Sequence, residues 1–155
     1  MTAPSIFLIA DRPDVVPGLA SALERQWPDW YGSRGNARAD LDSRCRRSEL
    51  PIGFVALDGE TPIGTIAIEK RSTATHTHLS PWIVGLWVAP SRRNARIAVR
   101  LMAAACDHAK RMGFHEIYTS AARQRRKPMA VWQQIGTGVT DGGDEVDIFR
   151  LSLQD

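Results

Sequence analysis

The residues in this sequence best suited to chemistry form a basic turn at residues 91–94 (SRRN). The turn follows an apolar run over residues 82–88, which predicts a buried strand broken at Pro90. It precedes a segment of helical periodicity that ends at Gly113, a residue type common at helix C-termini. The first amides of a helix lack intrahelical acceptors, and the helix dipole adds partial positive charge beside them. This succession of elements therefore predicts a site for an anionic ligand such as a phosphate.

A second group of cations, RQRRK at residues 123–127, stands out against a net charge of only +3. Clustered arginines favour a phosphorylated ligand, although a solvated basic face or a nucleic-acid patch would give the same pattern. Proteins that bind single-stranded nucleic acid interleave stacking aromatic residues with their cations, and neither group does so here. We therefore expect no nucleic-acid partner.

Three aromatic residues fall in one short segment, WPDWY at residues 27–31, followed by Gly32 and Gly35. Each ring taken alone would more often fill the edge of the core than contact a ligand. As a group beside a carboxylate, they could form the wall of a pocket for a cationic amine with an apolar or aromatic part. The candidate acceptor residues are Trp27, Asp29, Trp30 and Tyr31.

The chain of 155 residues has the length of about one domain, spanning residues 1–155. A chain of this length can bury a hydrophobic core without the help of disulfides or metal ions. Its 43% hydrophobic and 24% charged residues are ordinary for a globular protein, and its apolar runs are too short to span a membrane. The apolar run at residues 5–10 has no basic segment ahead of it, so we expect no signal peptide and a cytoplasmic protein. Cys45 and Cys106 lack the spacing of a metal or redox site, and we expect no metal.

Periodicity and turn residues divide the first half of the chain into elements that must position these groups. We predict that Asp14 caps the first helix and that Pro28 ends it. The turn Asp58-Gly59 predicts an antiparallel hairpin. The expected elements are a strand at 5–10, a helix at 14–27, an aromatic loop at 27–31, a surface helix at 36–47, and strands at 52–57 and 61–70.

The second half begins with a polar loop at 71–80 and continues with the strand at 82–88 and the helix that ends at Gly113. A strand, a long helix and another strand form a right-handed crossover, so the strands at 82–88 and 114–120 should run parallel. We then expect a short helix from Pro128 to about residue 134, ended by glycines 136 and 138, and a last strand at 145–153. This order predicts an α/β protein (an α+β mixed sheet) with helices on both faces.

The order of elements over nearly the whole chain resembles the GNAT superfamily of acetyl-CoA-dependent N-acetyltransferases, and the resemblance is densest from residue 81 to 136. Family members carry an Arg/Gln-x-x-Gly-x-Gly/Ala turn after a strand that ends in Val-x-Pro. Here VAP at residues 88–90 is followed by RNARIA at residues 93–98, in which Arg93 and Ala98 fit and Arg96 replaces the first glycine. With LSPWIVGL at residues 79–86 and WPDWY upstream, the sequence is similar to a subgroup of uncharacterised bacterial acetyltransferases.

The resemblance implies the acyl-CoA N-acyltransferase fold, a central mixed sheet of roughly six to seven strands flanked by about four helices. It implies that amides of residues 94–98 hold the pyrophosphate of CoA and that the backbone of residues 86–88 pairs with the pantetheine arm. Gly85 could mark a bulge near the thioester or simply pack under a tryptophan. Cations at 125–127 could reach the 3'-phosphate or form a solvated helix start. The implied cofactor residues are Leu86, Trp87, Val88, Arg93, Asn94, Ala95, Arg96, Ile97 and Ala98.

Arg96 stands where the backbone of family members closely approaches the pyrophosphate. An inward-pointing side chain would block the site. We expect ordinary helical dihedrals and an outward side chain, because the amides then remain accessible and the guanidinium can add a phosphate contact.

The catalytic residues are unknown. Family members often have a tyrosine that protonates the departing thiolate, and this sequence has Trp132 in its place. An indole N–H cannot serve as a general acid at neutral pH. The strand at 82–88 supplies no carboxylate, and Glu69, His76 and His78 are substitutes that could equally be plain surface residues. Positioning of a neutral amine and polarisation of the carbonyl by backbone N–H groups can provide most of the acceleration.

We therefore expect an N-acetyltransferase that transfers the acetyl group of acetyl-CoA to a primary amine by direct attack in a ternary complex. The acceptor would be a small molecule or a peptide, with no membrane partner, and a homodimer is left open. The alternative is a degenerate, non-catalytic GNAT domain that binds acyl-CoA as a sensor or partner module. The glycine lost at Arg96 and the tyrosine lost at Trp132 support that alternative.

Overall fold

Among the residues that the structure describes, seven β-strands form one mixed sheet, in the order β1-β2-β3-β4-β5-β7-β6. The computed structural model describes residues 3–33, 35–93, 96–123 and 131–154. The strands are β1 (Ser5–Leu8), β2 (Ile52–Asp58), β3 (Thr61–Glu69), β4 (Trp82–Val88), β5 (Glu116–Ala122), β6 (Gln133–Val139) and β7 (Glu145–Ser152). The helices are α1 (Val16–Gln26), α2 (Pro28–Ser33), α3 (Ala37–Ser43) and α4 (Ile97–Arg111). The mixed sheet with its helices confirms the predicted fold class.

The chain falls into two compact units. Unit 1 comprises Met1–Ala67 and Gly85–Ala105, and unit 2 comprises Ile68–Val84 and Cys106–Asp155. Of the helices in the described ranges, none is both long and apolar enough to cross a lipid bilayer.

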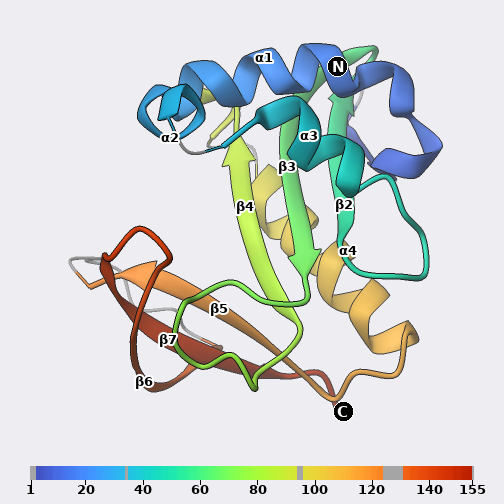
Figure 1. The fold of residues 1–155 in the computed structure, drawn as a ribbon. Helices are drawn as coiled ribbons and strands as arrows, with labels where there is room; N and C mark the ends of the chain where they lie inside the picture. Colours follow the sequence, from blue (N-terminus) through green and yellow to red (C-terminus); the bar gives the residue numbers. More distant parts are fainter. Residues whose placement is uncertain (1–2, 34, 94–95, 124–130, 155) are drawn as a thin grey trace. The chain divides into compact units, whose positions relative to one another are not determined.

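The strands of unit 1 are covered on both faces. All residues of β2 except the last are buried, whereas a strand with one face in water would alternate between buried and exposed residues. Figure 1 shows the reason, because α3 lies in front of β2 and β3 while α4 passes behind them. β1 and β2 pair antiparallel, with Ser5 opposite Leu57 and Leu8 opposite Phe54. The predicted helices on both faces are therefore observed for these strands.

Helix α1 is held by its apolar face. Val16, Leu19 and Leu23 are at most 1% exposed and pack in one cluster with Val55 and Leu57 of β2. Full burial of such side chains contributes roughly 1.5–3 kcal/mol each, far more than the intrinsic helix propensity of any one residue. The helix ends before Pro28, as predicted.

The start of α1 differs from the prediction that Asp14 caps it. Val15 occupies the N-cap position, and no side chain caps the helix. A 3₁₀ turn at Pro13–Val15 precedes the helix, and the Asp14 carboxylate instead accepts hydrogen bonds from the Arg12 guanidinium at 2.9 and 3.0 Å. The ion pair lowers the pKa of Asp14, because the hydrogen-bonded cation favours the charged carboxylate.

The segment between α1 and β2 contains two corrections. Residues 27–31, expected to be a loop, mostly belong to the short helix α2, which begins at Pro28 because proline suits the first helical position. The helix expected at 36–47 is shorter. Asn36 caps α3 by accepting the Ala39 amide at 2.9 Å, and the helix ends at Ser43. After the helix the chain is bonded to the sheet, because the Gly53 amide of β2 donates to the Arg44 carbonyl at 2.9 Å.

Unit 2 contains the parallel pairing that the crossover predicted. Trp82 of β4 lies opposite Tyr118 of β5 in a parallel register, and the Tyr118 amide donates to the Pro81 carbonyl at 3.0 Å. The Trp82 ring is fully buried and lies 5.7 Å from the Tyr118 ring, centroid to centroid. Its indole N–H donates to the Leu79 carbonyl at 2.8 Å, which ties the preceding loop to the strand.

The helix expected at residues 128–134 is wrong in its described part, because residues 133–139 form strand β6. β6 pairs antiparallel with β7, with a register shift between Gln134 and Gly136. The loop at 71–80 also bonds to β6: the Val139 amide donates to Thr75 Oγ1 at 3.0 Å, and the Ala74 amide donates to the Val139 carbonyl at 2.9 Å. Pairing with these distant partners makes the segment a strand, although Gly136 and Gly138 locally suggest the end of a helix. Residues 124–130, including Pro128, lie outside the described residues.

Candidate functional site

The C-terminal half of β4 combines a left-handed glycine with two exposed positions. Gly85 has φ +65° and is exposed, and Leu86 is 38% exposed. The next two residues, Trp87 and Val88, are buried again. The exposed stretch includes Leu86, the first residue of the segment that we expect to contact the pantetheine arm, and that role stays a prediction.

Arg44, not a tryptophan, packs beside Gly85. A Cβ atom placed on Gly85 would lie 3.4 Å from Arg44 Nη1, and Arg44 is only 9% exposed. Sequence reasoning missed this buried cation because residues 36–47 were expected to form a surface helix. Arg44 lies in a short segment with many charged residues, so the sequence alone does not indicate that its side chain is buried.

Within unit 2, a side-chain hydrogen bond follows the backbone pairing between β4 and β5. Trp82 and Tyr118 are paired, but the next carbonyl along β4, that of Ile83, accepts the Thr119 hydroxyl at 3.1 Å. A side-chain hydrogen bond thus satisfies a backbone acceptor at this point of the strand. Buried carbonyls need such partners, and Thr119 is itself buried.

The basic turn after β4 is fastened to the protein by its own arginines. Arg92 pairs with Asp58 at the end of β2. Arg93 donates from Nε to the Val88 carbonyl at 3.1 Å and from Nη2 to Gln26 Oε1 at 3.1 Å. Arg93 thus links the end of β4 to the C-terminal end of α1. Gln26 was not singled out in the sequence, because nothing local marks a partner 67 residues away in the chain.

Arg96 does not adopt the ordinary helical dihedrals that we expected. Its φ is +61°, a left-handed conformation that glycine adopts at no steric cost. Arg96 is exposed to solvent, and the outward direction of its side chain stays a prediction. The Arg96 carbonyl accepts the Arg100 amide at 3.2 Å, which makes Arg96 the residue from which α4 starts. The two preceding predicted residues, Asn94 and Ala95, lie outside the described residues.

The first turn of α4 presents amide donors on a fixed base. In a helix that starts from Arg96, the amides of Ile97, Ala98 and Val99 have no intrahelical acceptor. Ile97 is 1% exposed and packs against β3, where a Cβ on Gly64 would lie 3.3 Å from Ile97 Cγ2. The close approach of helix and strand fixes these donors in place, and the helix dipole favours an anion beside them.

Replacing Arg96 with glycine should stabilise the protein. A left-handed φ costs a non-glycine residue about 1–2 kcal/mol, and the greater freedom of glycine in the unfolded chain offsets roughly half of the gain. We expect Arg96→Gly to raise the melting temperature by roughly 2–4 °C in a calorimetric scan. Arg96→Ala is the control, because it removes the cation and keeps the strain. Equal melting temperatures for the two variants would contradict the assigned backbone strain.

The four candidate acceptor residues divide into two pairs. Trp27 and Tyr31 are partly buried and pack against the cluster that holds α1. Trp30 is 43% exposed, and its indole lies so close to Gly35 that a Cβ there would be 2.4 Å from Nε1. Asp29 is exposed at the start of α2. The structure therefore packs Trp27 and Tyr31 against the core and leaves Asp29 and Trp30 at the surface.

Tyr31 has a polar partner that the sequence did not indicate. Its hydroxyl donates to Asp40 Oδ2 of α3 at 3.3 Å. Burial, followed by the Asp40 charge, raises the pKa of Tyr31 to about 12, so the hydroxyl stays protonated at neutral pH.

The side chains considered for proton transfer lie in unit 2. His76 has a left-handed φ of +55°, its Nδ1 is 3.0 Å from Thr75 Oγ1, and its ring stacks on that of His78 with centroids 6.2 Å apart. Trp132, just before β6, is half-buried, and so is Glu69 at the end of β3. Within the described ranges, no group of three or more His, Cys, Asp or Glu side chains could hold a metal ion.

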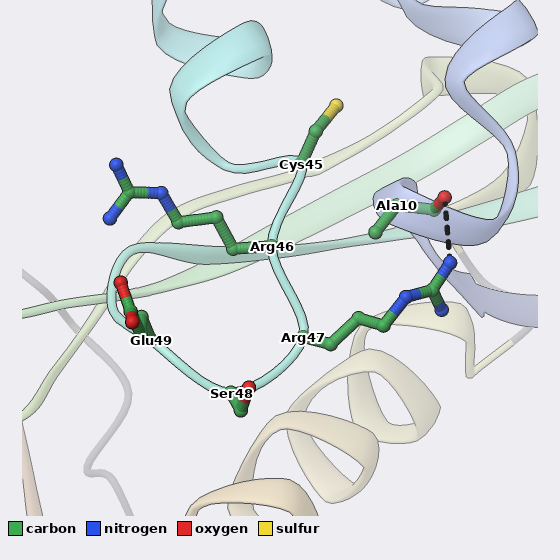
Figure 2. Close-up of a pocket in the computed structure, with 6 residues that line it drawn as sticks. All are labelled: Ala10, Cys45, Arg46, Arg47, Ser48 and Glu49. Atoms are coloured by element: carbon green, nitrogen blue, oxygen red, sulfur yellow. Dashed lines mark hydrogen bonds between the residues drawn. The ribbon is translucent and has the colours of Figure 1, made fainter.

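A cavity of about 540 Å³ lies between Ala10 and residues 45–49 in unit 1 (Figure 2). Its cations already bond to the protein: Arg47 Nη2 donates to the Ala10 carbonyl at 3.2 Å, and Arg46 donates to the Leu50 carbonyl at 3.0 Å. Cys45 on its wall is a half-buried thiol whose pKa is raised by burial, which disfavours the reactive thiolate. This cavity therefore supplies neither a free cation nor an activated nucleophile.

The mixed sheet and its helices match the fold of solved acetyltransferase structures. The family model described as "Acetyltransferase (GNAT) family" matches residues 19–136. The chain belongs to the GNAT acetyltransferase family. No curated protein matches the sequence.

Solved structures of this fold cover almost the whole chain. Aminoglycoside 6'-acetyltransferase type Ii aligns with a TM-score of 0.76 and 17% identity, over 97% of this chain and 98% of that chain. Aminoglycoside 6'-N-acetyltransferase complexed with coenzyme A aligns with a TM-score of 0.74 and 15% identity, over 97% and 98%. The protein yncA of Salmonella typhimurium, solved with its cofactor acetyl-CoA, gives 0.69 and 15%, over 99% and 96%. At these identities the likeness establishes the GNAT fold.

Proposed function

We propose that this protein is an acetyl-CoA-dependent N-acetyltransferase that acetylates a primary amine by direct attack in a ternary complex. The observation that carries the proposal is the left-handed backbone of Arg96, at the position where family members have glycine. The chain keeps the glycine-like conformation although the glycine itself is lost, which supports retention of the phosphate-binding turn. That residues 1–155 act as one domain stays a prediction.

The described residues fit acetyl-CoA in two places. The amides of Ile97 and Ala98 would hold the pyrophosphate, with the exposed Arg96 side chain beside them. The pantetheine arm would lie along the exposed residues Gly85 and Leu86 of β4. Trp87 and Val88 would contribute main-chain groups only, because their side chains are buried. Arg93 would act by holding the turn, since its guanidinium bonds Val88 and Gln26.

The chemistry that bound acetyl-CoA supplies is an activated thioester. The protein's contribution, in this proposal, is to orient the amine and to polarise the carbonyl with backbone N–H groups of β4. We assign no side chain as general base or acid. Trp132 has only an indole donor, and water can carry the proton.

The acceptor is proposed to approach from the α2 segment, where Trp30 and Asp29 are exposed and suit an amine with an apolar part. Two of the three structural neighbours named above are aminoglycoside acetyltransferases. Aminoglycosides are therefore the first amines to test, followed by polyamines and peptides with free amino groups.

The test begins with binding and continues with turnover. Acetyl-CoA at about 100 times its Kd should stabilise the folded state by about 2.7 kcal/mol, which raises the melting temperature by roughly 5–10 °C. Release of free thiol from acetyl-CoA in the presence of an amine should then follow. The absence of any stabilisation would rule out both an enzyme and an acyl-CoA sensor.

The second candidate is a non-catalytic acyl-CoA sensor. Trp132 in place of the family's tyrosine favours it, because no acid for the departing thiolate is evident. Clear stabilisation by acetyl-CoA without thiol release over the whole amine panel would support the sensor and overturn the enzyme.

A further inference from the structure

A buried cation lies beside the part of β4 that the proposed function gives to acetyl-CoA. Arg44 directly follows α3 and is only 9% exposed, although arginine is among the residue types that are least often buried. A Cβ atom placed on Gly85 would lie 3.4 Å from Arg44 Nη1, 3.8 Å from Nη2 and 3.9 Å from Cζ. The charged end of the side chain therefore lies next to this glycine. Both residues belong to unit 1.

Gly85 keeps the space beside the guanidinium open. The glycine is itself exposed, and its φ of +65° is one that residues with a side chain rarely adopt. Any other residue here would place its Cβ against the guanidinium. A ligand that lies along the exposed part of β4 can therefore approach the cation where no side chain intervenes from β4 itself.

The proposed course of the pantetheine arm brings its sulfur end toward this cation. The arm starts at the pyrophosphate, which the proposed function assigns to the amides of Ile97 and Ala98. Because β4 runs toward that turn, the arm passes Leu86 before it reaches Gly85. The sulfur is at the end of the arm that is far from the phosphates. It therefore comes nearer to Gly85, and to Arg44, than the rest of the cofactor does.

The departing sulfur needs a group that stabilises its negative charge. We assigned no described side chain as the acid that would protonate it, since Trp132 has only an indole donor. A positive charge held in place can stabilise a developing anion directly, and a largely buried charge is screened by water less than an exposed one. A guanidinium also keeps its charge throughout the pH range in which enzymes work.

We propose that the Arg44 guanidinium stabilises the CoA thiolate that departs when the amine is acetylated. The amine nitrogen forms a bond to the carbonyl carbon, and the C–S bond breaks with its electron pair on sulfur. The proton of the amine passes to water, and the thiolate remains beside Arg44 until it is released. This role rests on the proposed function, because it requires acetyl-CoA to lie along β4.

The test compares the equilibrium binding of CoA and desulfo-CoA by calorimetry, so it needs no acceptor. An ordinary thiol ionises near pH 8.5, and a close cation favours its ionised form by about tenfold to a thousandfold. The ratio of the desulfo-CoA Kd to the CoA Kd should therefore rise about 10- to 100-fold between pH 6.5 and pH 9.5. This ratio cancels the titration of groups that the two ligands share.

Two titratable side chains adjoin the cation. Tyr31 of α2 feels the charges of both Arg44 and Asp40 of α3. Burial, followed by the Asp40 charge, raises the pKa of Tyr31 to about 12, so this hydroxyl keeps its proton throughout the test. A rise in the ratio between pH 6.5 and pH 9.5 therefore does not report on Tyr31.

Variants assign the effect to the cation. Arg44→Gln and Arg44→Met remove the charge and should abolish the rise, and Met fills much of the buried volume. Desulfo-CoA should still bind to them, which shows that they fold. Arg46→Gln changes the net charge equally at an exposed position and should keep the rise.

The outcomes separate this role from the proposed function. A ratio that does not rise with pH in the parent protein overturns the role of Arg44 even where both ligands bind. A rise that persists in Arg44→Gln and Arg44→Met overturns it as well. If neither CoA nor desulfo-CoA binds to the parent protein, the proposed function fails together with this inference.

Discussion

Replacing Ala98 with proline is expected to weaken acetyl-CoA binding about tenfold to hundredfold while the protein stays folded. Proline removes the second amide of α4, which the proposed function assigns to the pyrophosphate. A hydrogen bond to a charged group contributes about 1.5–3 kcal/mol, which corresponds to this loss of affinity. The helix itself loses nothing, because that amide has no intrahelical acceptor.

Another helix of this chain, α1, already has a proline at the equivalent position. Pro17 occupies the second position of α1, and the residue before it, Val16, keeps helical dihedrals of −57° and −45°. Ala98→Gly is the matched control, because it keeps the amide and should leave affinity nearly unchanged. The Kd is measured by calorimetry, and the melting temperature without ligand checks the fold. Full affinity in Ala98→Pro would remove the first turn of α4 from the binding site.

Gly138→Ala is expected to lower the melting temperature by roughly 4–8 °C. A Cβ on Gly138 would lie 2.5 Å from Thr75 Oγ1, which no real contact allows. Thr75 cannot swing away freely, because its hydroxyl oxygen accepts the Val139 amide at 3.0 Å. Forcing an extra carbon into a packed region costs about 1–3 kcal/mol, and loss of this bond places the cost toward the upper end.

Gly136→Ala provides a matched control on the same strand. A Cβ there would meet only His76 Nε2, at 3.9 Å, an ordinary contact. This variant should be as stable as the parent or slightly more stable, since alanine loses less conformational freedom on folding than glycine. Thermal unfolding of both variants is compared directly. If Gly138→Ala is no less stable than Gly136→Ala, the packing of the 71–80 loop on β6 is incorrect.

Hydrophobic periodicity and turn residues were enough to locate most of the sheet. The predicted strand at 82–88 coincides with β4, and the hairpin strands at 52–57 and 61–70 correspond to β2 and β3. These runs are long and apolar, and Asp58-Gly59 is a local turn signal, so neighbouring residues carry the information. The parallel pairing of β4 with β5 also followed, because a crossover of this kind has one favoured hand.

Strand β6 was missed because its cause is not local. Gly136 and Gly138 look like helix terminators in the sequence. In the folded chain β7 pairs along β6, and Gly138 leaves room for Thr75, more than 60 residues earlier. Similarly, the sequence pattern does not reveal that the Gly53 amide of β2 donates to the Arg44 carbonyl just after α3.

For the candidate site, the sequence by itself determined that a strand, a basic turn and a helix follow one another, and hence where unpaired amides would lie. Only the tertiary structure decided the conformation of Arg96 and the partners of Arg93. It alone also revealed that the Arg44 guanidinium is buried beside Gly85. The physical reason is that a helix end is set by bonds between near neighbours, whereas backbone strain, buried cations and cavities depend on contacts between residues far apart in the chain.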